Sequence, residues 1–445
     1  MHDALTYLID LAAAVVEASR VRPGDSVAGY GPNTTGATLI RPGGRACYPA
    51  FWIRDFAMSL ESAAPVSAPL SGSPPPSGPL PSAPLLSGLI HPDEAEHALR
   101  LTARLQAPAD RTLRSGSFVP RGSIADHITF DGQPIFYPGT IDDVENQGAP
   151  WGYLPSLDDH YYFVEMAWHV AVACSRRAIL TERIDGVALL DRLAVAFDVP
   201  RVRPATGLVW CDEADRGVSF GFTDTVVHTG ELLFCSLLRQ RAARQMADLV
   251  TVAGRPDQAA RYAAIADTLA THIPATFAHP SGFLRASTGL SAQPDVWGTA
   301  FAVYTGAVPE PVADRLSHAL HRALLDGAIA WRGQIRHVPT WGDHRSDSAW
   351  ERVVGGFPHN HYQNGAYWGT PLGWVCAAIA RVDEPAAQQL ALDYVAALQP
   401  EDFRRGDDYG APFECMHPDG DHRQNPVYMA SVTCPLGAFR RLGWI

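Results

Sequence analysis

The chain of 445 residues contains no lysine, so all 35 of its basic residues are arginine. Its 47 acidic residues outnumber them and give a net charge of -12, and no dense basic run offsets this excess. A protein that follows the phosphates of a nucleic acid needs a basic surface. The charge balance therefore argues against a nucleic-acid partner.

Long apolar runs are also absent, and no segment approaches the roughly 20 uninterrupted apolar residues of a membrane span. The first residues, Met1–Leu5, lack the positive charge that precedes the apolar stretch of a secretory leader. The seven cysteines are odd in number, widely spaced and without a Cys-x-x-Cys pair, which favours free thiols in a reducing compartment. We therefore expect a cytoplasmic protein with no membrane partner.

Several catalytic motifs are missing. There is no Gly-x-Ser-x-Gly elbow, phosphate-binding loop or dinucleotide fingerprint, which argues against serine hydrolases, kinases and dehydrogenases. The histidines in His359–His361 and His417–His422 match no spacing with known metal geometry. We expect neither a metal ion nor another cofactor.

One segment, Pro65–Gly88, is so rich in Pro, Ser, Gly and Leu that it can build neither a helix nor a strand ladder. Helical patterns flank it on both sides, so it interrupts a domain and does not link two. With 47% hydrophobic residues the chain can bury a large core. We predict a single domain over residues 1–445 with a low-complexity surface insertion at 65–88.

Helical periodicity recurs twelve times along the chain. Several of these segments begin with Pro in the first turn or Asp in the cap region, which are physical start signals. The predicted helices are Ala4–Arg20, one opening at Arg54, Pro92–Gln106, Asp158–Leu180, Asp185–Asp198, Asp224–Ala253, Pro256–Ile273, Val296–Gly306, Pro309–Asp326, Gln363–Val382, Pro385–Leu398 and Pro426–Arg441.

The connections between these helices alternate between short and long, as expected for a ring of six helical hairpins. The predicted fold class is therefore all-α, an (α/α)6 toroid whose long loops gather at one end and form a pocket. Strand-like runs inside the long loops, such as Ile124–Phe136 with Asp131-Gly132 as its turn, predict small β-hairpins.

The predicted second helix begins with residues that suit a sugar. Asp55 can accept paired hydroxyl hydrogen bonds, Arg54 donates in a fixed fork, and Trp52 offers an apolar face to a pyranose ring. The alternative is an acidic residue favoured by the helix dipole next to a packed tryptophan.

Carboxylates in aromatic surroundings occupy the long loops. Glycosidic cleavage needs one carboxylic acid to protonate the leaving oxygen and one carboxylate to activate water or attack the anomeric carbon. Asp212 and Glu414 could supply them, because nearby Trp210 and Phe413 would partly desolvate the two groups. The alternative for the first loop is a solvated acidic turn of Asp212, Glu213 and Asp215 paired with Arg216.

Four motifs occur in a characteristic order: Trp-x-Arg-Asp at 52–55, an acidic loop between helices five and six, Tyr-Gln-Asn-Gly-x-Tyr-Trp at 362–368, and Glu-x-x-x-Pro-x-Gly at 414–420. This order resembles that of the six-hairpin (α/α)6-barrel glycosidases, which include glucoamylases and trehalase-like enzymes. The resemblance covers nearly the whole chain apart from the Pro-rich insertion.

The resemblance implies roles for individual residues. Arg54 and Asp55 would hold the non-reducing sugar, and Glu414 would be the catalytic base. Asp212 would be the acid, because its spacing to Arg216 is similar to that of the trehalase-type motif; the residues between them depart from that motif, so Asp215 or Glu213 is an alternative acid. Further sugar contacts are expected from Trp52, Asp159, Trp210, Gln363, Asn364 and Trp368.

The sequence therefore predicts a glycoside hydrolase with a carbohydrate as its partner, acting on a short glycan or glycoside with inversion. The nearer alternative is a sugar isomerase, epimerase or lyase on the same toroid, with His228, His359 or His417 as acid and base. The farther alternative is a carbohydrate-binding or structural toroid without catalysis. The pattern of residues predicts no oligomeric state.

Overall fold

The computed structural model describes residues 1–445 except 28–30, 46, 64–87, 114–115 and 138–150. Within the described residues it has twelve α-helices, as the periodicity predicts. The Pro-rich insertion predicted at 65–88 falls, except for its last residue, outside the described residues. The helices are α1 His2–Ser19, α2 Ile53–Ala63, α3 Pro92–Arg104, α4 Asp159–Trp168, α5 Leu189–Phe197, α6 Leu233–Val252, α7 Ala259–Phe277, α8 Val296–Tyr304, α9 Glu310–Leu325, α10 Leu372–Ala380, α11 Glu384–Leu398 and α12 Ala430–Arg441.

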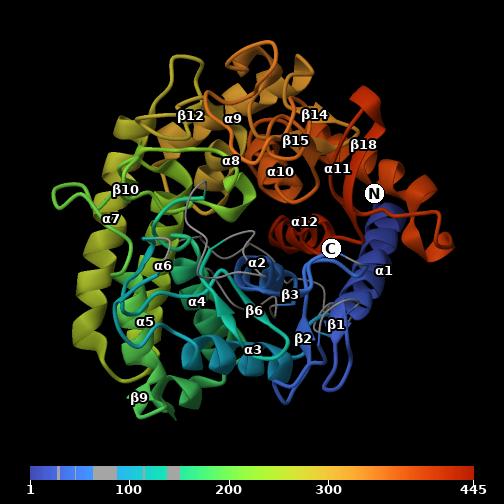
Figure 1. Ribbon diagram of the computed structural model, residues 1–445. Coiled ribbons are helices and arrows are strands. Elements are labelled where there is room, and N and C mark those ends of the chain that lie inside the picture. Colours follow the sequence, from blue (N-terminus) through green and yellow to red (C-terminus); the bar gives the residue numbers. More distant parts are fainter. Residues whose placement is uncertain (28–30, 46, 64–87, 114–115, 138–150) are drawn as a thin grey trace.

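The even-numbered helices contact one another in a closed succession. Each of α2, α4, α6, α8 and α10 contacts the next even-numbered helix, and α12 contacts both α10 and α2. Odd-numbered helices pack on this inner group: α7 lies against α6, α9 against α8 and α10, and α11 against α10 (Figure 1). The inner helices α8 and α10 are consequently apolar all round, as expected for buried helices.

Contact between α12 and its neighbours depends on small side chains. A Cβ atom added to Gly373 on α10 would lie 2.5 Å from the Cβ of Ala438 and 3.0 Å from the Cα of Pro435, both on α12. On the other side of α12, the buried Thr433 hydroxyl donates to the Ser59 hydroxyl of α2 at 2.8 Å. These contacts join the last helix of the succession to the first.

Three predicted helices begin or end nine or more residues from their observed bounds. The helix predicted from Asp224 begins only at Leu233, because Gly230 takes a φ of +76° and Gly230–Glu231 pairs with Trp210–Cys211. The helix predicted from Gln363 begins at Leu372, because Tyr367–Trp368 joins a sheet. The one predicted over 158–180 leaves α-helical geometry after Trp168 and continues as a π-helical turn. Strand pairing thus overrides local helical periodicity in the long loops.

Short antiparallel strands fill those loops. Strands β14 to β18 form a five-stranded sheet in chain order, and β3, β6 and β7 form a three-stranded one. The hairpin predicted within 124–136 is confirmed as β6–β7. The strands are β1 Arg20–Val21, β2 Leu39–Ile40, β3 Ala50–Trp52, β4 Arg111–Thr112, β5 Phe118–Val119, β6 His127–Thr129, β7 Pro134–Ile135, β8 Arg183–Ile184, β9 Val187–Ala188, β10 Trp210–Cys211, β11 Gly230–Glu231, β12 Leu284–Arg285, β13 Pro294–Asp295, β14 Ala330–Trp331, β15 Gln334–Arg336, β16 Tyr367–Trp368, β17 Phe413–His417 and β18 His422–Pro426.

Two sequence-based expectations can be compared with the structure directly. All seven cysteines are free thiols. Among the helices of the described residues, none combines the length and apolar character needed to cross a membrane.

The close approach of α10 and α12 makes a stability prediction. We expect Gly373→Ala to lower the free energy of unfolding by roughly 1–3 kcal/mol, because the added methyl group overpacks the interface. Helix propensity alone predicts the opposite sign, a gain of about 1 kcal/mol. Urea unfolding measures the difference. Gly437→Ala is the control, because its added atom would meet only the flexible Glu61 side chain and nearby backbone at 3.1–3.3 Å; an equal loss in both variants would contradict the argument.

Candidate active site

Three carboxyl side chains from distant parts of the chain gather at one end of the inner helices. Asp55 lies in the first turn of α2, Asp224 follows a short 3-10 helix, and Glu414 lies on β17. Asp55 and Asp224 are both near enough to raise the pKa of Glu414. Glu414 is 2% exposed and Asp55 3%, while Asp224 is partly exposed. Of the three, the sequence singled out Asp55 and Glu414.

Both oxygens of Glu414 accept hydrogen bonds. The Tyr48 hydroxyl donates to Oε1 at 2.5 Å, and the Asn425 amide donates to Oε2 at 2.5 Å from the neighbouring strand β18. Burial raises the pKa of Glu414 to about 8, and the bonds from Tyr48 and Asn425 oppose this rise because they favour the carboxylate. The side chain is therefore fixed in orientation and has a pKa in the neutral range.

The backbone around Glu414 is strained. Tyr48, Tyr362 and Asn425 have φ angles of +56°, +48° and +49°, in the left-handed region that non-glycine residues seldom adopt. Tyr48 and Asn425 bond to Glu414, and Tyr362 is close enough for Glu414 to raise its pKa. Residues held in this conformation gather at functional sites, where the surrounding structure must enforce it.

Asp55 is held by an aromatic hydroxyl. Tyr428 donates a short hydrogen bond to its Oδ1, and burial raises the pKa of Asp55 to about 6. Trp52, just before α2, has one ring face stacked on His127 with centroids 4.3 Å apart, and Tyr48 meets it edge-on at 4.9 Å. Trp52 is thus partly exposed but shares its faces with protein side chains.

Arg54, the neighbour of Asp55 in the chain, forms ion pairs with three aspartates. Its guanidinium lies 2.6 Å from Asp126, 3.0 Å from Asp158 and 2.6 Å from Asp159, and all four side chains are buried. Arg54 and His127 lower the pKa of Asp126 to about 2 against the effect of burial. Arg54 is thus engaged by the protein, whereas Asp159 Oδ1 has no hydrogen-bond partner among the described residues. The roles of Arg54 and Asp159 as sugar ligands stay predictions.

The turn that carries Asp224 rests directly on Arg54. Gly221 donates its N–H to Asp158 Oδ2 at 2.9 Å, and a Cβ atom at Gly221 would lie 2.0 Å from Arg54 Nε, so only glycine fits. Burial raises the pKa of Asp224 to about 7. Its Oδ1 has no hydrogen-bond partner among the described residues. Sequence reasoning missed Asp224 by treating it as the cap of a helix.

The predicted acid loop lies at the surface in the structure. Asp212 is exposed, Glu213 forms an exposed ion pair with Arg352, and Asp215 forms two 2.8 Å bonds to Arg201. These are the contacts of a solvated acidic turn, the alternative weighed from the sequence, but the ion pairs are formed with Arg352 and Arg201 and were expected with Arg216. The ring of Trp210 is covered by Arg203 at 3.7 Å and lies 4.6 Å from Arg201, so it does not present an open face.

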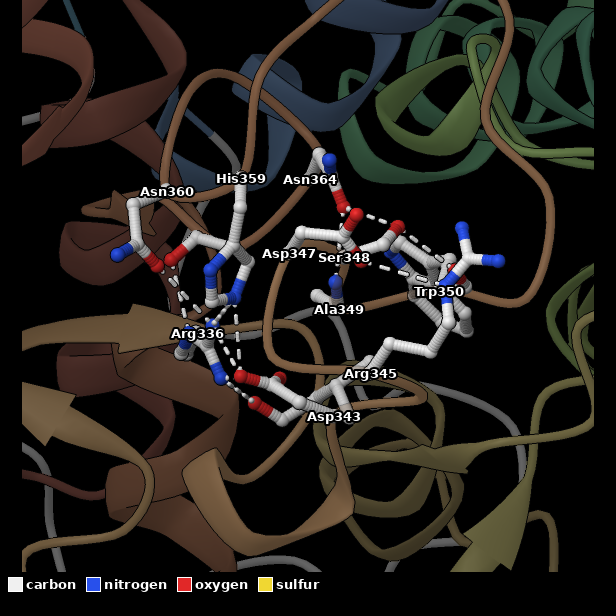
Figure 2. Close-up of polar contacts among 12 residues, drawn as sticks. Arg336, Asp343, Arg345, Asp347, Ser348, Ala349, Trp350, His359, Asn360 and Asn364 are labelled. Atoms are coloured by element: carbon white, nitrogen blue, oxygen red, sulfur yellow. Dashed lines mark hydrogen bonds and ion pairs between the residues drawn. The ribbon is translucent and has the colours of Figure 1, made fainter.

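Asn364 fixes a loop by hydrogen bonds, and Trp368 packs against the ring of Tyr362. The Asn364 amide oxygen accepts bonds from the Ser348 hydroxyl and the Ala349 N–H, and its nitrogen donates to the Phe357 carbonyl (Figure 2). Trp368 is fully buried 5.3 Å from Tyr362, and its indole N–H has no partner among the described residues. Gln363 is fully buried and bonds to Thr225.

The histidines proposed for the isomerase alternative lie in other contacts. His228 is buried against Ser219, His359 pairs with Asp343 at 3.0 Å, and His417 stacks on Tyr367. Figure 2 shows His359 in a separate network with Arg336 and Asp343. Among the described residues, no group of three or more His, Cys, Asp or Glu side chains is arranged to hold a metal ion.

Comparison with family models finds no match, and neither does comparison with the curated proteins. Solved structures do match over the whole chain. A rhamnosidase from Klebsiella oxytoca with rhamnose bound has a TM-score of 0.56 at 11% identity over 100% of this chain, which spans 64% of the rhamnosidase chain. A GH63 mannosylglycerate hydrolase from Thermus thermophilus in complex with glucose has a TM-score of 0.52 at 13% identity, with 97% and 99% of the two chains covered.

A third similar structure is the glucoamylase of Hormoconis resinae, with a TM-score of 0.53 at 13% identity over 99% of this chain and 74% of that one. The chain therefore has a fold similar to that of these three glycosidase structures, in line with the resemblance in motif order. At these identities the likeness concerns the fold, and the chemistry has to be argued from the site itself.

The ion cluster around Arg54 makes a stability prediction. We expect Arg54→Met to lower the free energy of unfolding by about 3–5 kcal/mol, because it leaves three buried aspartates without their counter-charge. Arg352→Met removes the exposed pair with Glu213 and should change stability by less than about 1 kcal/mol. Chemical denaturation of both variants checks the difference. Equal stability of the two would mean that the aspartates are neutral in the folded protein.

Proposed function

We propose that the protein is a glycoside hydrolase whose twelve helices form an (α/α)6 toroid. The closed succession of even-numbered helices supports the toroid. The observation that carries the function is the pair Asp224 and Glu414, each with a pKa in the neutral range, in a chain with a glycosidase fold. Two carboxyl groups that exchange protons near neutral pH are what glycosidic cleavage requires.

We assign Glu414 as the base and Asp224 as the acid. Both oxygens of Glu414 accept hydrogen bonds, from Tyr48 and Asn425, which suits a carboxylate that takes a proton from water. Asp224 has an oxygen without a partner among the described residues, which suits a carboxylic acid that donates to the leaving oxygen. The same order of acid before base along the chain was expected from the sequence, with Asp212 in the place of Asp224.

The substrate is proposed to be a short glycan or glycoside, cleaved with inversion in the cytoplasm. The matched structures contain rhamnose and glucose, which supports a carbohydrate ligand. Asp55 would bind a sugar hydroxyl, and Tyr362 would offer a partly exposed ring. Inversion needs room for a water molecule between the two carboxyl groups, so they would stand about 6.5–9.5 Å apart in the substrate complex.

The acid and base variants test this proposal. Glu414→Gln and Asp224→Asn should each reduce turnover of a natural glycoside by at least about a hundredfold, the usual scale for loss of a general base or acid. An aryl glycoside with a good leaving group needs less protonation, so it should partly rescue Asp224→Asn and not Glu414→Gln. Reducing-sugar release and proton NMR of the first product measure rate and anomer.

Asp212→Asn is the matched control, because replacing this exposed residue should leave the turnover of the glycoside unchanged. A dead Asp212 variant beside an active Asp224 variant would overturn the assignment of the acid. Interconversion of free monosaccharides without hydrolysis would favour the isomerase, and sugar binding without turnover would favour a non-catalytic toroid.

The pH dependence of kcat/KM should be a narrow bell. Activity requires the base ionised and the acid protonated, so it falls as pH drops below the lower apparent pKa and again as pH rises above the higher one. The base, Glu414, has a pKa of about 8 and the acid, Asp224, one of about 7, so the form with Glu414 ionised and Asp224 protonated is a minority of the free protein. Its population still peaks between pH 7 and 8, where the optimum should lie. A profile that is flat between pH 5 and 9 would contradict the assigned pair.

A further inference from the structure

Gln363 has its whole side chain bonded to the turn that presents Asp224. Its Oε1 accepts from the Thr225 N–H at 2.8 Å and from the Thr225 hydroxyl at 2.7 Å. Its Nε2 donates to the Gly221 carbonyl at 3.1 Å. The amide therefore spans the turn from Gly221, the first residue of the 3-10 segment, to Thr225, which follows Asp224.

The backbone that carries Gln363 is anchored independently of this turn. Its carbonyl accepts a bond from the Trp350 indole N–H at 3.0 Å, and the adjacent Asn364 is tied to the 348–349 segment (Figure 2). On the other side, Tyr362 has a positive φ, and its N–H bonds to His422 on β18 at 3.3 Å. The backbone segment that carries the Gln363 amide is thus fixed by hydrogen bonds to residues outside the Asp224 turn.

The amide of Gln363 also lies near the Asp224 carboxyl group and lowers its pKa against the dominant effect of burial. The backbone N–H of the residue after Asp224 and the Arg54 guanidinium lower this pKa as well, and Asp126 raises it. Glu414 and Asp224 interact across the site. Gln363 therefore acts on the proposed acid as well as on the turn that carries it.

We propose that Gln363 is a positioning residue that fixes the Asp224 turn and aims its carboxyl group at the leaving oxygen. This inference rests on the proposed function. It replaces the sequence-based role of Gln363 as a sugar ligand: the side chain is completely buried, and both of its polar atoms are engaged with the protein. A sugar hydroxyl would have to break one of these bonds to reach it.

The test compares Gln363→Met with Gln240→Met. Gln240 on α6 is also completely buried, and its amide atoms have no hydrogen-bond partner among the described residues, so its replacement controls for a lost buried glutamine. For aryl glycosides with poor leaving groups, Gln363→Met should reduce kcat at least about tenfold with little change in KM. For those with good leaving groups the loss should stay within about threefold, because they need less help from the acid.

Two readouts separate positioning from a merely structural role. The acid limb of the pH profile should move to higher pH in Gln363→Met, because Asp224 has the lower of the two pKa values and loses the amide that lowers it. Amide hydrogen exchange over residues 221–225 should speed up in Gln363→Met and not in Gln240→Met. If Gln363→Met does not fold, Gln363→Glu serves instead: it keeps the acceptor for Thr225 and removes the donor to the Gly221 carbonyl. It should shift the same limb upward, because it places a second acidic group beside Asp224.

Three outcomes would overturn the inference. They are a KM increase shared by all substrates with an unchanged pH profile, a loss of kcat independent of the leaving group, and unaltered exchange over 221–225. A parent protein that hydrolyses no glycoside refutes the proposed function instead. The exchange measurement still reports on the contact between Gln363 and the turn in that case.

Discussion

The structure of the site depends on one buried charge, the guanidinium of Arg54. It is nearly inaccessible to water and lies among three buried aspartates, so neither the arginine nor its partners could remain in place alone. Its position in the first turn of α2 places Asp55 beside it. The same guanidinium supports the turn of Gly221 and Asp224, because Asp158 bridges the two. One ion cluster therefore sets the relative positions of two of the three candidate carboxyl groups.

The third carboxyl group is positioned by a sheet and not by a charge. Strands β17 and β18 bring Asn425 next to Glu414, and the segment before β3 contributes the Tyr48 hydroxyl. These bonds favour the ionised form, while burial favours the neutral form, and the balance leaves the pKa of Glu414 at about 8. Asp224 reaches a similar value with fewer donors and the Arg54 charge nearby. Two different environments thus bring both groups to the pH range in which a proton can pass between protein and substrate.

The helices could be predicted from the sequence because their apolar periodicity is local, and the order of motifs pointed to the glycosidase fold. Asp55 could be identified because it ends the Trp-x-Arg-Asp motif at the start of a predicted helix. Glu414 could be identified because it begins the Glu-x-x-x-Pro-x-Gly motif. Asp224 did not, since Val226 and Val227 continue the periodicity of α6 upstream of its true start, and only pairing of Gly230–Glu231 with β10 ends it. Asp212 was chosen for its spacing to an arginine, but spacing says nothing of exposure. Which loop turns inward is decided by contacts between residues more than a hundred positions apart.

The closed succession of inner helices also constrains the order in which the site can be assembled. Asp55 and its helix are synthesised early, but the Tyr428 hydroxyl that holds Asp55 and the strand that carries Glu414 come after α11. The face of α2 that packs against α12 stays uncovered until that last helix of the succession docks. A nascent or truncated chain that lacks α12 is therefore both an open, apolar intermediate and a chemically incomplete one. Appearance of the assembled site would report completion of the fold itself.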